Sequence, residues 1–236
     1  MNHILLFNDD YYSESRVVIR DSYRLKHITQ VLKAKTDSIL KVGKLNGKLG
    51  RGRVICLEEN ECHMETLLSD DPPPALPCTL IVALPRPKSL KKVIEAATVM
   101  GVKEMYIIKS WRVDKSYWST PVLQESHLNS LMYKALEQAV DTAVPKIHIR
   151  RQFRPFAEDE LPGIAESKTA YIAHPYDSLP APSKLRSPAV LIIGPEGGFI
   201  PFEIELMKKQ GCSVISMGSR IMRVEHAVCA FLGKMF

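Results

Sequence analysis

The spacing of apolar and polar positions changes about one third of the way along the chain. Before that point, apolar residues form short runs typical of strands, and two such runs over 38–45 and 48–57 flank the hairpin signal Asn46-Gly47. One helical stripe interrupts the runs over 24–35. Short strands at this spacing favour a small β-barrel. The other strands predicted in this region cover 4–7, 16–19 and 63–68.

From residue 78 onward, apolar strand-like runs alternate with helical stripes. This alternation predicts an α/β domain with a mostly parallel sheet and helices on both faces. The predicted strands are 78–84, 105–108, 146–149, 170–173, 189–193 and 213–216. The predicted helices are one capped by Ser89 and stopped by Gly101, and three over 128–139, 201–210 and 224–235.

A proline-rich segment separates the two patterns. Three consecutive prolines follow Asp71, and such a run joins neither a helix nor a central strand. We therefore expect a β-barrel domain over 1–70, a semi-rigid linker over 71–77 and an α/β domain over 78–236.

The composition excludes several classes of protein. The chain has 236 residues, 45% of them hydrophobic, but no apolar run approaches the ~18 residues of a membrane span. Its start lacks the pattern of a secretory signal. The five cysteines form no Cys-x-x-Cys pair and the seven histidines show no ligand spacing. The sequence thus predicts a cytoplasmic protein with reduced thiols, no bound metal and no membrane association.

Positive charge is concentrated near the N-terminus. From Arg16 to Arg53 there are eleven Lys or Arg and two acids, a local charge of +9; since the whole chain carries +6, the remainder carries −3. Such a basic region favours binding to a phosphate backbone. A solvated cationic face without a partner, an acidic protein and a membrane surface are the alternatives. The aromatic content of 7% argues against a stacking platform for single strands.

Two glycine-bearing loops follow predicted strands in the last third of the chain. The first is Gly194-Pro-Glu-Gly-Gly198, and the second begins at Gly218. Glycines let main chain approach a ligand that any Cβ would exclude. The loops therefore favour a ligand site at the carboxyl edge of the sheet, although a pair of ordinary tight turns is the alternative.

These loops carry a family resemblance. The stretch from Leu191 to Gly198 and the stretch from Met217 to Ala227 resemble the motifs Leu-Ile-Gly-Pro-Glu-Gly-Gly and Leu-Gly-x-Arg-Ile-Leu-Arg-x-Glu-Thr-Ala of the bacterial RsmE family. That family methylates N3 of a uridine in small-subunit (16S) ribosomal RNA and belongs to the SPOUT class of S-adenosylmethionine-dependent enzymes. The resemblance implies a C-terminal trefoil knot, a PUA-like N-terminal barrel, a homodimer and a partner in ribosomal RNA or the small ribosomal subunit.

The resemblance also implies the site residues. Arg223 and Arg220 would supply positive charge near the target base or its phosphate. Glu225 is a candidate base or a helix cap, and His226, which replaces a Thr of the motif, is a candidate proton acceptor or a structural imidazole. Glu196 would either bind the ligand or brace its loop. The residues implied for the cofactor are Ala173, His174, Pro175, Ile193, Gly194, Pro195, Glu196, Gly197, Gly198, Ser216, Met217, Gly218, Arg220, Ile221 and Met222.

Other positions concern the RNA. The family shows Glu-Gln-x-x-Arg in its middle helix, whereas this chain has Glu137-Gln138 with Asp141 at the position of the arginine. This departure puts the identity of the target nucleotide more in question than that of the cofactor. Two alternatives follow: a methyltransferase acting on a different RNA nucleotide, or a non-catalytic RNA-binding protein. The residues predicted to contact RNA are Arg16, Arg24, Lys26, Lys33, Lys35, Arg86 and Arg112.

Overall fold

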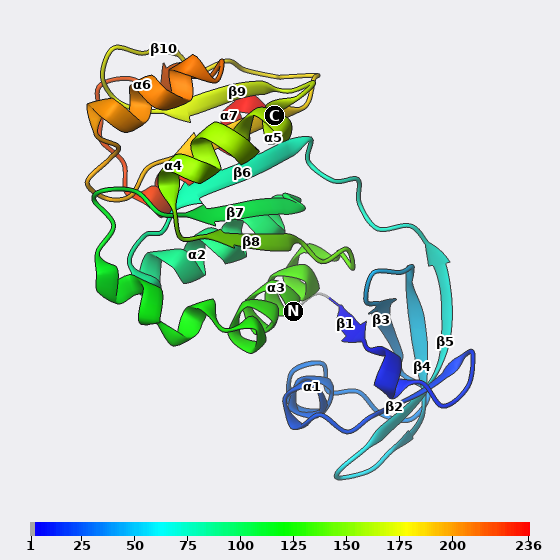
Figure 1. Cartoon of the computed structure of the whole chain (residues 1–236). Coiled ribbons are helices and arrows are strands. Elements are labelled where there is room, and N and C mark those ends of the chain that lie inside the picture. The colour runs from blue at the N-terminus through cyan, green and yellow to red at the C-terminus, as the bar shows by residue number, and fades with distance from the viewer. Residues whose placement is uncertain (1–2) are drawn as a thin grey trace. The chain divides into compact units, whose positions relative to one another are not determined.

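The computed structural model describes residues 3–236, and the chain divides into two compact units. Unit 1 comprises Met1–Pro74 and Tyr133–Val144, and unit 2 comprises Ala75–Met132 and Pro145–Phe236. Figure 1 shows the order of their elements.

Unit 1 is a curled five-stranded sheet with the order β1-β3-β4-β5-β2. Its pairs are antiparallel except for β1 with β3. In the described chain no ladder joins the edge strands β1 and β2, so the expected barrel takes the form of an open half-barrel. The strands are β1 (Ile4–Leu6), β2 (Arg16–Ile19), β3 (Ile39–Lys44), β4 (Leu49–Leu57) and β5 (Cys62–Asp70). The helical turns are η1 (Asn8–Asp10), α1 (Ser22–Lys26) and η2 (His27–Val31).

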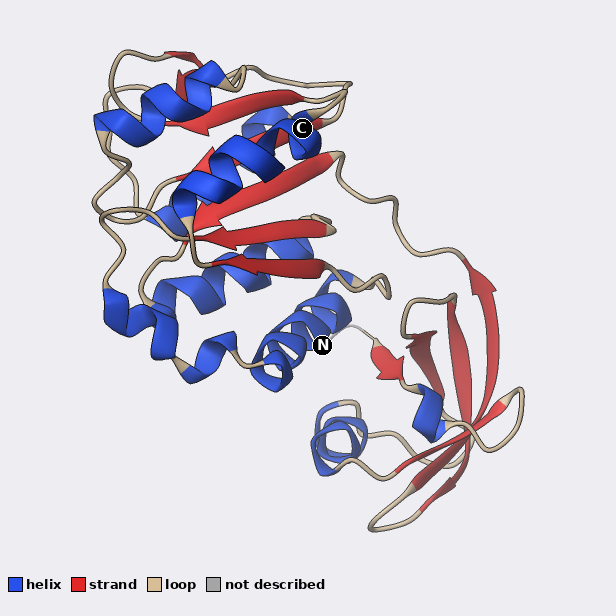
Figure 2. Cartoon of the chain, in the orientation of Figure 1, coloured by secondary structure: helices blue, strands red, loops and turns tan. Residues whose placement is uncertain are grey.

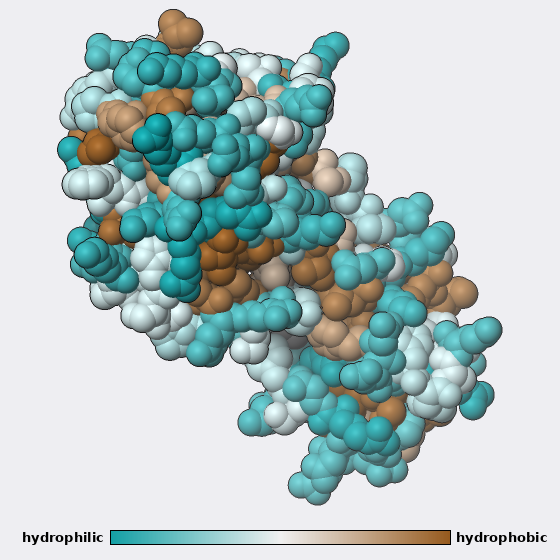
Figure 3. Space-filling model, in the orientation of Figure 1, coloured by the Kyte–Doolittle hydropathy of each residue, from teal (hydrophilic) through white to brown (hydrophobic). Residues whose placement is uncertain are grey.

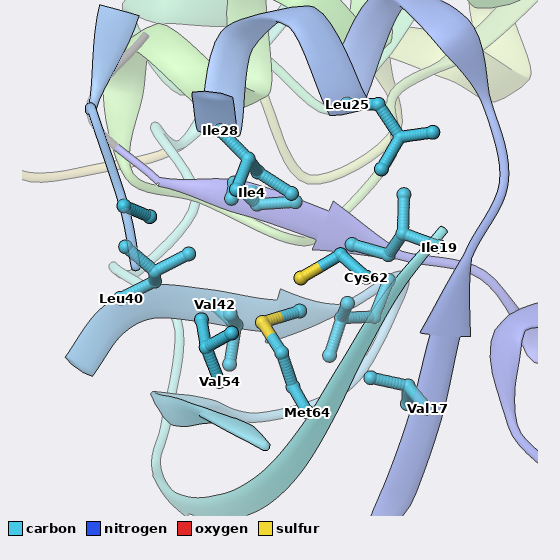
Figure 4. Close-up of a cluster of buried hydrophobic side chains, with 12 residues drawn as sticks. Ile4, Val17, Ile19, Leu25, Ile28, Leu40, Val42, Val54, Cys62 and Met64 are labelled. Carbon is cyan, nitrogen blue, oxygen red and sulfur yellow. The ribbon is translucent and has the colours of Figure 1, made fainter. Parts of the chain in front are cut away.

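The inner face of this sheet holds the core of unit 1. Alternate residues of each strand point inward, and the side chains of Leu25 and Ile28 close the cluster from the helical segment (Figure 4). This segment ends at Val31, earlier than the predicted helix over 24–35. The cluster includes Ile4, Val17, Ile19, Leu40, Val42, Val54, Cys62 and Met64.

The segment Tyr133–Val144 joins unit 1 through polar contacts far apart in sequence. The Glu137 carboxylate accepts a hydrogen bond from the backbone N–H of Leu5 (3.2 Å), and the Glu137 carbonyl lies 3.1 Å from Nδ1 of His3. The N–H of Asn46 donates to the carbonyl of Thr142 (2.8 Å). Glu137 and Asp141 are therefore parts of the interior of unit 1, because both side chains are buried there.

Unit 2 is built on a seven-stranded sheet with the order β10-β12-β9-β11-β6-β7-β8, and every pair in it is parallel. This confirms the predicted parallel α/β sheet. The strands are β6 (Cys78–Ala83), β7 (Glu104–Ile108), β8 (Lys146–Arg150), β9 (Thr169–Ala173), β10 (Leu179–Pro180), β11 (Ala189–Ile193) and β12 (Ser213–Ser216).

Helices cover both faces of this sheet (Figure 2). Helix α2 packs against α7 on one face, and α6 packs against η5 on the other. The first helix begins at Pro87, so the prediction of Ser89 as its cap is wrong: proline suits the first helical turn, where its missing N–H costs nothing. The helical elements are α2 (Pro87–Val99), η3 (Lys115–Ser119), η4 (Pro121–Leu123), α3 (Glu125–Ala139), α4 (Phe153–Pro155), η5 (Phe156–Glu160), α5 (Leu161–Ala165), α6 (Pro201–Lys209) and α7 (Val224–Met235). The part of α3 from Tyr133 onward belongs to unit 1.

Residues 3–236 contain neither a membrane-spanning helix nor a cluster of metal-ligating side chains. No helix is long and apolar enough to cross a membrane, and no group of three His, Cys, Asp or Glu side chains is arranged to hold a metal ion. The trefoil knot implied by the resemblance stays a prediction.

Candidate functional site

A pocket of about 260 Å³ opens at the carboxyl edge of the sheet of unit 2. Three loops form it, those that follow β9, β11 and β12. Strand β9 pairs with both other strands in parallel, so Ala173 lies opposite Ile193 on one side and Ile215 on the other. This register brings the three strand ends together. All fifteen residues predicted to contact a cofactor line the pocket.

The glycines of these loops meet specific conformational or steric needs. A Cβ on Gly194 would lie 3.2 Å from the backbone nitrogen of Phe199, too close for an ordinary contact. Gly198 and Gly218 have φ angles of +70° and +100°, which residues with a Cβ rarely adopt. The main chain therefore borders the pocket directly at these bends.

Two side chains brace the loop after β11. The carboxylate of Glu196 accepts a hydrogen bond from the backbone N–H of Arg86 (2.9 Å), at the N-terminus of α2. The guanidinium of Arg112 donates to the carbonyl of Gly197. Glu196 thus has the bracing role, one of its two predicted roles, while it also lines the pocket.

The opposite wall is apolar. Val224, Ala227 and Phe231 of α7 line it, beside Ile193 at the end of β11. Val224 and Ala227 lie within the second motif and Phe231 lies beyond it, but none of the three was among the residues predicted for the cofactor. Their helical spacing marks one face of the helix. A pocket with one apolar wall and exposed main-chain polar groups suits a ligand that combines a flat apolar ring with polar ends.

His174 and Tyr176 border the pocket after β9. Burial lowers the pKa of His174 and outweighs the opposing influence of Asp177. The imidazole is therefore favoured in its neutral form, and its ring makes an edge contact with Tyr176 at 5.6 Å between centroids.

The three candidate catalytic residues occupy different places. Arg220 lines the pocket, and Arg223 is the exposed residue that precedes α7. Glu225 is buried on the α7 side that meets α2, where its carboxylate lies 3.4 Å from Nζ of Lys92. A hydrogen bond from its own backbone N–H, followed in weight by its contacts with Ser89 and Lys92, lowers the pKa of Glu225 despite burial. Glu225 therefore lies in the first turn of α7, outside the pocket lining, and α7 has no side-chain cap hydrogen bond at its N-cap residue, Arg223. His226 is exposed.

The residues predicted to contact RNA also lie in different parts of the structure. Arg16, Lys26, Lys33 and Lys35 are exposed on unit 1. Arg24 is buried: its guanidinium donates to Asp10 (2.5 and 3.0 Å) and to the carbonyl of Leu5 (3.1 Å). The assignment of Arg24 to an RNA-contacting surface is therefore wrong, because this arginine serves the interior of unit 1. Arg86 and Arg112 lie in unit 2 beside the pocket loop.

Comparison with known proteins identifies the class to which this site belongs. Residues 72–235 match the model of a family described as an RNA methyltransferase domain, so the chain belongs to that RNA methyltransferase family. Ribosomal RNA small subunit methyltransferase E of Treponema pallidum is 25% identical over 237 residues, which cover 97% of this chain and 88% of that protein. The protein of the same name from Mesomycoplasma hyopneumoniae is 24% identical over 194 residues, covering 76% and 83%.

A solved structure shares the fold. The crystal structure of a ribosomal RNA small subunit methyltransferase E from Neisseria gonorrhoeae, bound to S-adenosyl methionine, superposes with a TM-score of 0.77 and 20% identity. The match covers 98% of this chain and 95% of that chain. The resemblance to the RsmE family is confirmed by these comparisons.

Proposed function

We propose that the protein transfers a methyl group from S-adenosylmethionine to N3 of a uridine in 16S ribosomal RNA of the small ribosomal subunit. The observation that carries the proposal is the pocket where the glycine-bearing ends of β11 and β12 meet the end of β9. The relatives named ribosomal RNA small subunit methyltransferase E support the reaction, and the Neisseria structure bound to S-adenosyl methionine supports the cofactor.

The lining residues fit the proposed cofactor. The apolar wall of α7 suits the adenine ring, and the backbone groups at Gly194 and Gly218 suit the polar ends of the molecule. When bound, the cofactor supplies an electrophilic methyl sulfonium, which is the source of the chemical driving force. The chain's own part is to fix the position of that methyl group relative to the base.

The target atom needs help from the protein. Uracil N3 carries a proton, and it becomes a good nucleophile only when that proton leaves. Arg220 in the pocket lining and Arg223 at its rim would stabilise the negative charge that develops on the carbonyl oxygens of the base. Glu225 is poorly placed to accept the proton, because its carboxylate is buried toward Lys92.

A homodimer forms part of the proposal. Two apolar side chains of the pocket lining stay exposed, Ile221, which is 74% open to solvent, and Met217. Leu179 of the edge strand β10 is exposed as well. Exposed apolar residues that surround a functional site are typical of an interface, and a second copy of the chain would cover them. Sedimentation of the purified protein tests this part directly.

The exposed cations of unit 1 would hold the phosphate backbone. Arg16, Lys26, Lys33 and Lys35 are all open to solvent, and each phosphate they neutralise releases counterions. RNA affinity should then fall steeply as salt increases. A cytoplasmic location agrees with a ribosomal substrate and completes the proposal.

The test is transfer of a labelled methyl group to small ribosomal subunits isolated from a strain that lacks the gene, followed by mass mapping of the modified nucleotide. The proposal predicts one new N3-methyluridine in 16S ribosomal RNA. Methylation of another nucleotide would keep the enzyme and change its target. RNA binding without any transfer would favour a non-catalytic RNA-binding protein, the alternative raised by Asp141 in place of the family's arginine.

A further inference from the structure

A second hollow lies in unit 2 at the same edge of the sheet as the pocket. It measures about 350 Å³ and is formed by the residues after β7, the residues after β8 and the start of α6. Figure 3 shows apolar residues among hydrophilic ones along this edge, toward which the strand arrowheads of Figure 1 point. Three aromatic side chains line the hollow: Trp111, Phe153 and Phe202. We call it the aromatic–basic hollow.

Trp111 is exposed, yet its backbone is fixed. Its side chain is 79% open to solvent, and that of Phe202 is 56% open. The N–H of Trp111 donates to the carboxylate of Glu203 (2.8 Å), which also accepts from Ile200 N–H (3.0 Å) and the Ser110 hydroxyl (3.1 Å). Glu203 is itself only 2% exposed. A buried carboxylate with three donors thus fixes the backbone that carries the exposed indole.

The charge of the aromatic–basic hollow is positive. Lys109, Arg151 and Arg154 line it, and Glu203 is the one acid in its lining. The Arg151 guanidinium lies 5.3 Å from the centre of the Trp118 ring, and the Arg154 guanidinium pairs with the carboxylate of Glu158 (2.9 Å), which is outside the lining. Because the Glu203 carboxylate is buried under its donors, the cations dominate the surface that a ligand would meet.

The aromatic–basic hollow lies next to the cofactor pocket. The rings of Phe153 and Phe199 lie 6.4 Å apart, and Phe199 packs beside Gly194 of the pocket. On the other side Trp111 lines the hollow while the next residue, Arg112, lines the pocket and donates to the Gly197 carbonyl. Adjacent sites of this kind can hold the cofactor in one and part of the substrate in the other.

We infer that the aromatic–basic hollow binds single-stranded RNA, with a base adjacent to the methylated nucleotide stacked on Trp111 and Phe202. Exposed aromatic faces accept bases of any sequence, and the cations beside them would hold the phosphates. The low overall aromatic content argued against such a platform, but three of the aromatic residues are gathered in this one hollow. The adjacency to the methylated nucleotide rests on the proposed function.

The experiment uses the tryptophan as its own reporter. The chain has two tryptophans, so Trp118→Phe leaves Trp111 as the single emitter while it keeps a ring under Arg151. This full-length variant is titrated with an oligouridine of about eight nucleotides. Base stacking should quench the Trp111 emission saturably. In the otherwise unchanged protein, Trp111→Ala or Phe202→Ala should weaken oligouridine binding about tenfold, the scale of one lost stacking contact.

Matched variants and donor binding separate the outcomes. Arg154→Ala, which removes a cation of the hollow, should also weaken oligouridine binding. Val99→Ala removes an exposed apolar side chain elsewhere, and Lys209→Ala removes an exposed cation elsewhere; both controls should bind oligouridine normally. Affinity for S-adenosylmethionine should stay within twofold in every variant. An unquenched Trp111, or normal oligouridine binding by Trp111→Ala, would overturn the inference.

Three further outcomes identify another occupant or a failure of the proposed function. If Trp111→Ala converts a dimer to a monomer and leaves RNA affinity unchanged, the hollow binds a second copy and the inference is wrong. If Trp111→Ala loses binding of a ribosomal protein and retains oligouridine, the inference is equally wrong. Quenching in a protein that binds no S-adenosylmethionine would keep the RNA site and refute the proposed methyl transfer.

Discussion

Arg112 and Gly197 fit together as a brace at the mouth of the cofactor pocket. The guanidinium donates to the Gly197 carbonyl, and the Arg112 side chain packs close to the position that a Cβ on residue 197 would occupy, with Cδ 3.0 Å from it. The absence of a side chain at Gly197 therefore lets an arginine from the loop after β7 reach the loop after β11.

The first prediction concerns this brace. Arg112→Ala should weaken S-adenosylmethionine binding about threefold to tenfold, because the loss of a charge-assisted hydrogen bond frees the loop. Isothermal titration calorimetry measures the change. Lys91→Ala, which removes an exposed cation from α2, is the control and should bind as the wild type does. Equal affinities of the two variants would show that Arg112 does not hold the loop.

The second prediction compares two glycine substitutions. A Cβ at Gly194 meets backbone atoms of Phe199 and Gly198 at 3.2 and 3.3 Å, so Gly194→Ala should displace the loop and reduce donor affinity by at least tenfold. At Gly163 in α5 a Cβ meets nothing within 4 Å. Gly163→Ala should therefore bind the donor normally. Its free energy of unfolding should be unchanged or higher, by up to about 1 kcal/mol, and its unfolding temperature should not fall. Normal donor binding by Gly194→Ala would mean that the loop does not shape the pocket.

A third prediction divides the two arginines of the motif. Arg223→Ala should abolish methyl transfer and leave donor affinity within a few-fold, because Arg223 is outside the pocket lining. Arg220→Ala should weaken donor binding as well, because Arg220 lines the pocket. A transfer assay on small subunits, run beside calorimetry, distinguishes these effects. Full turnover by Arg223→Ala would remove it from the catalytic set.

The fourth prediction is a pH dependence of stability. Burial lowers the pKa of His3, whose ring nitrogen Nδ1 lies 3.1 Å from the Glu137 carbonyl while Nε2 is buried without a partner in the described structure. As the pH falls below about 7, the unfolded chain takes up the proton first, since an unperturbed histidine titrates near 6.5. His3 thus contributes a loss of stability on acidification, with a slope of at most about 1.4 kcal/mol per pH unit.

Unfolding temperatures measured between pH 7.5 and 5 test this dependence. His3→Asn keeps a hydrogen-bond donor near the carbonyl and removes the titration, so its unfolding temperature should fall less than that of the wild type. His127→Asn changes an exposed histidine and should follow the wild-type curve. An identical slope for His3→Asn and the wild type would contradict the assignment.

Much of the site could be predicted because its signals are local. The apolar run of β11 ends at Gly194 and that of β12 ends two residues before Gly218, so both strands were predicted with the bounds that the structure shows. The pocket follows from these strand ends and from the parallel order of the sheet. The pairing of β9 between β11 and β12 completes the geometry.

Other features depend on contacts that no local pattern reveals. The assignment of Tyr133–Val144 to unit 1 rests on hydrogen bonds to His3, Leu5 and Asn46, more than 90 positions away. The helical stretch from Phe153 to Ala165 was missed because Pro155, Pro162 and Gly163 interrupt its pattern. Arg24 was predicted to be a surface cation because its partner, the buried Asp10, is fourteen positions away and no local pattern links the two residues.

The central claim is that the glycine-bearing ends of β11 and β12 hold the methyl donor. Calorimetric titration of the purified full-length protein with S-adenosylmethionine tests it most directly. The account predicts saturable binding at one site per chain, lost or strongly weakened in Gly194→Ala and intact in Gly163→Ala. Absence of saturable binding by the wild-type protein, or equal binding by all three proteins, would contradict it.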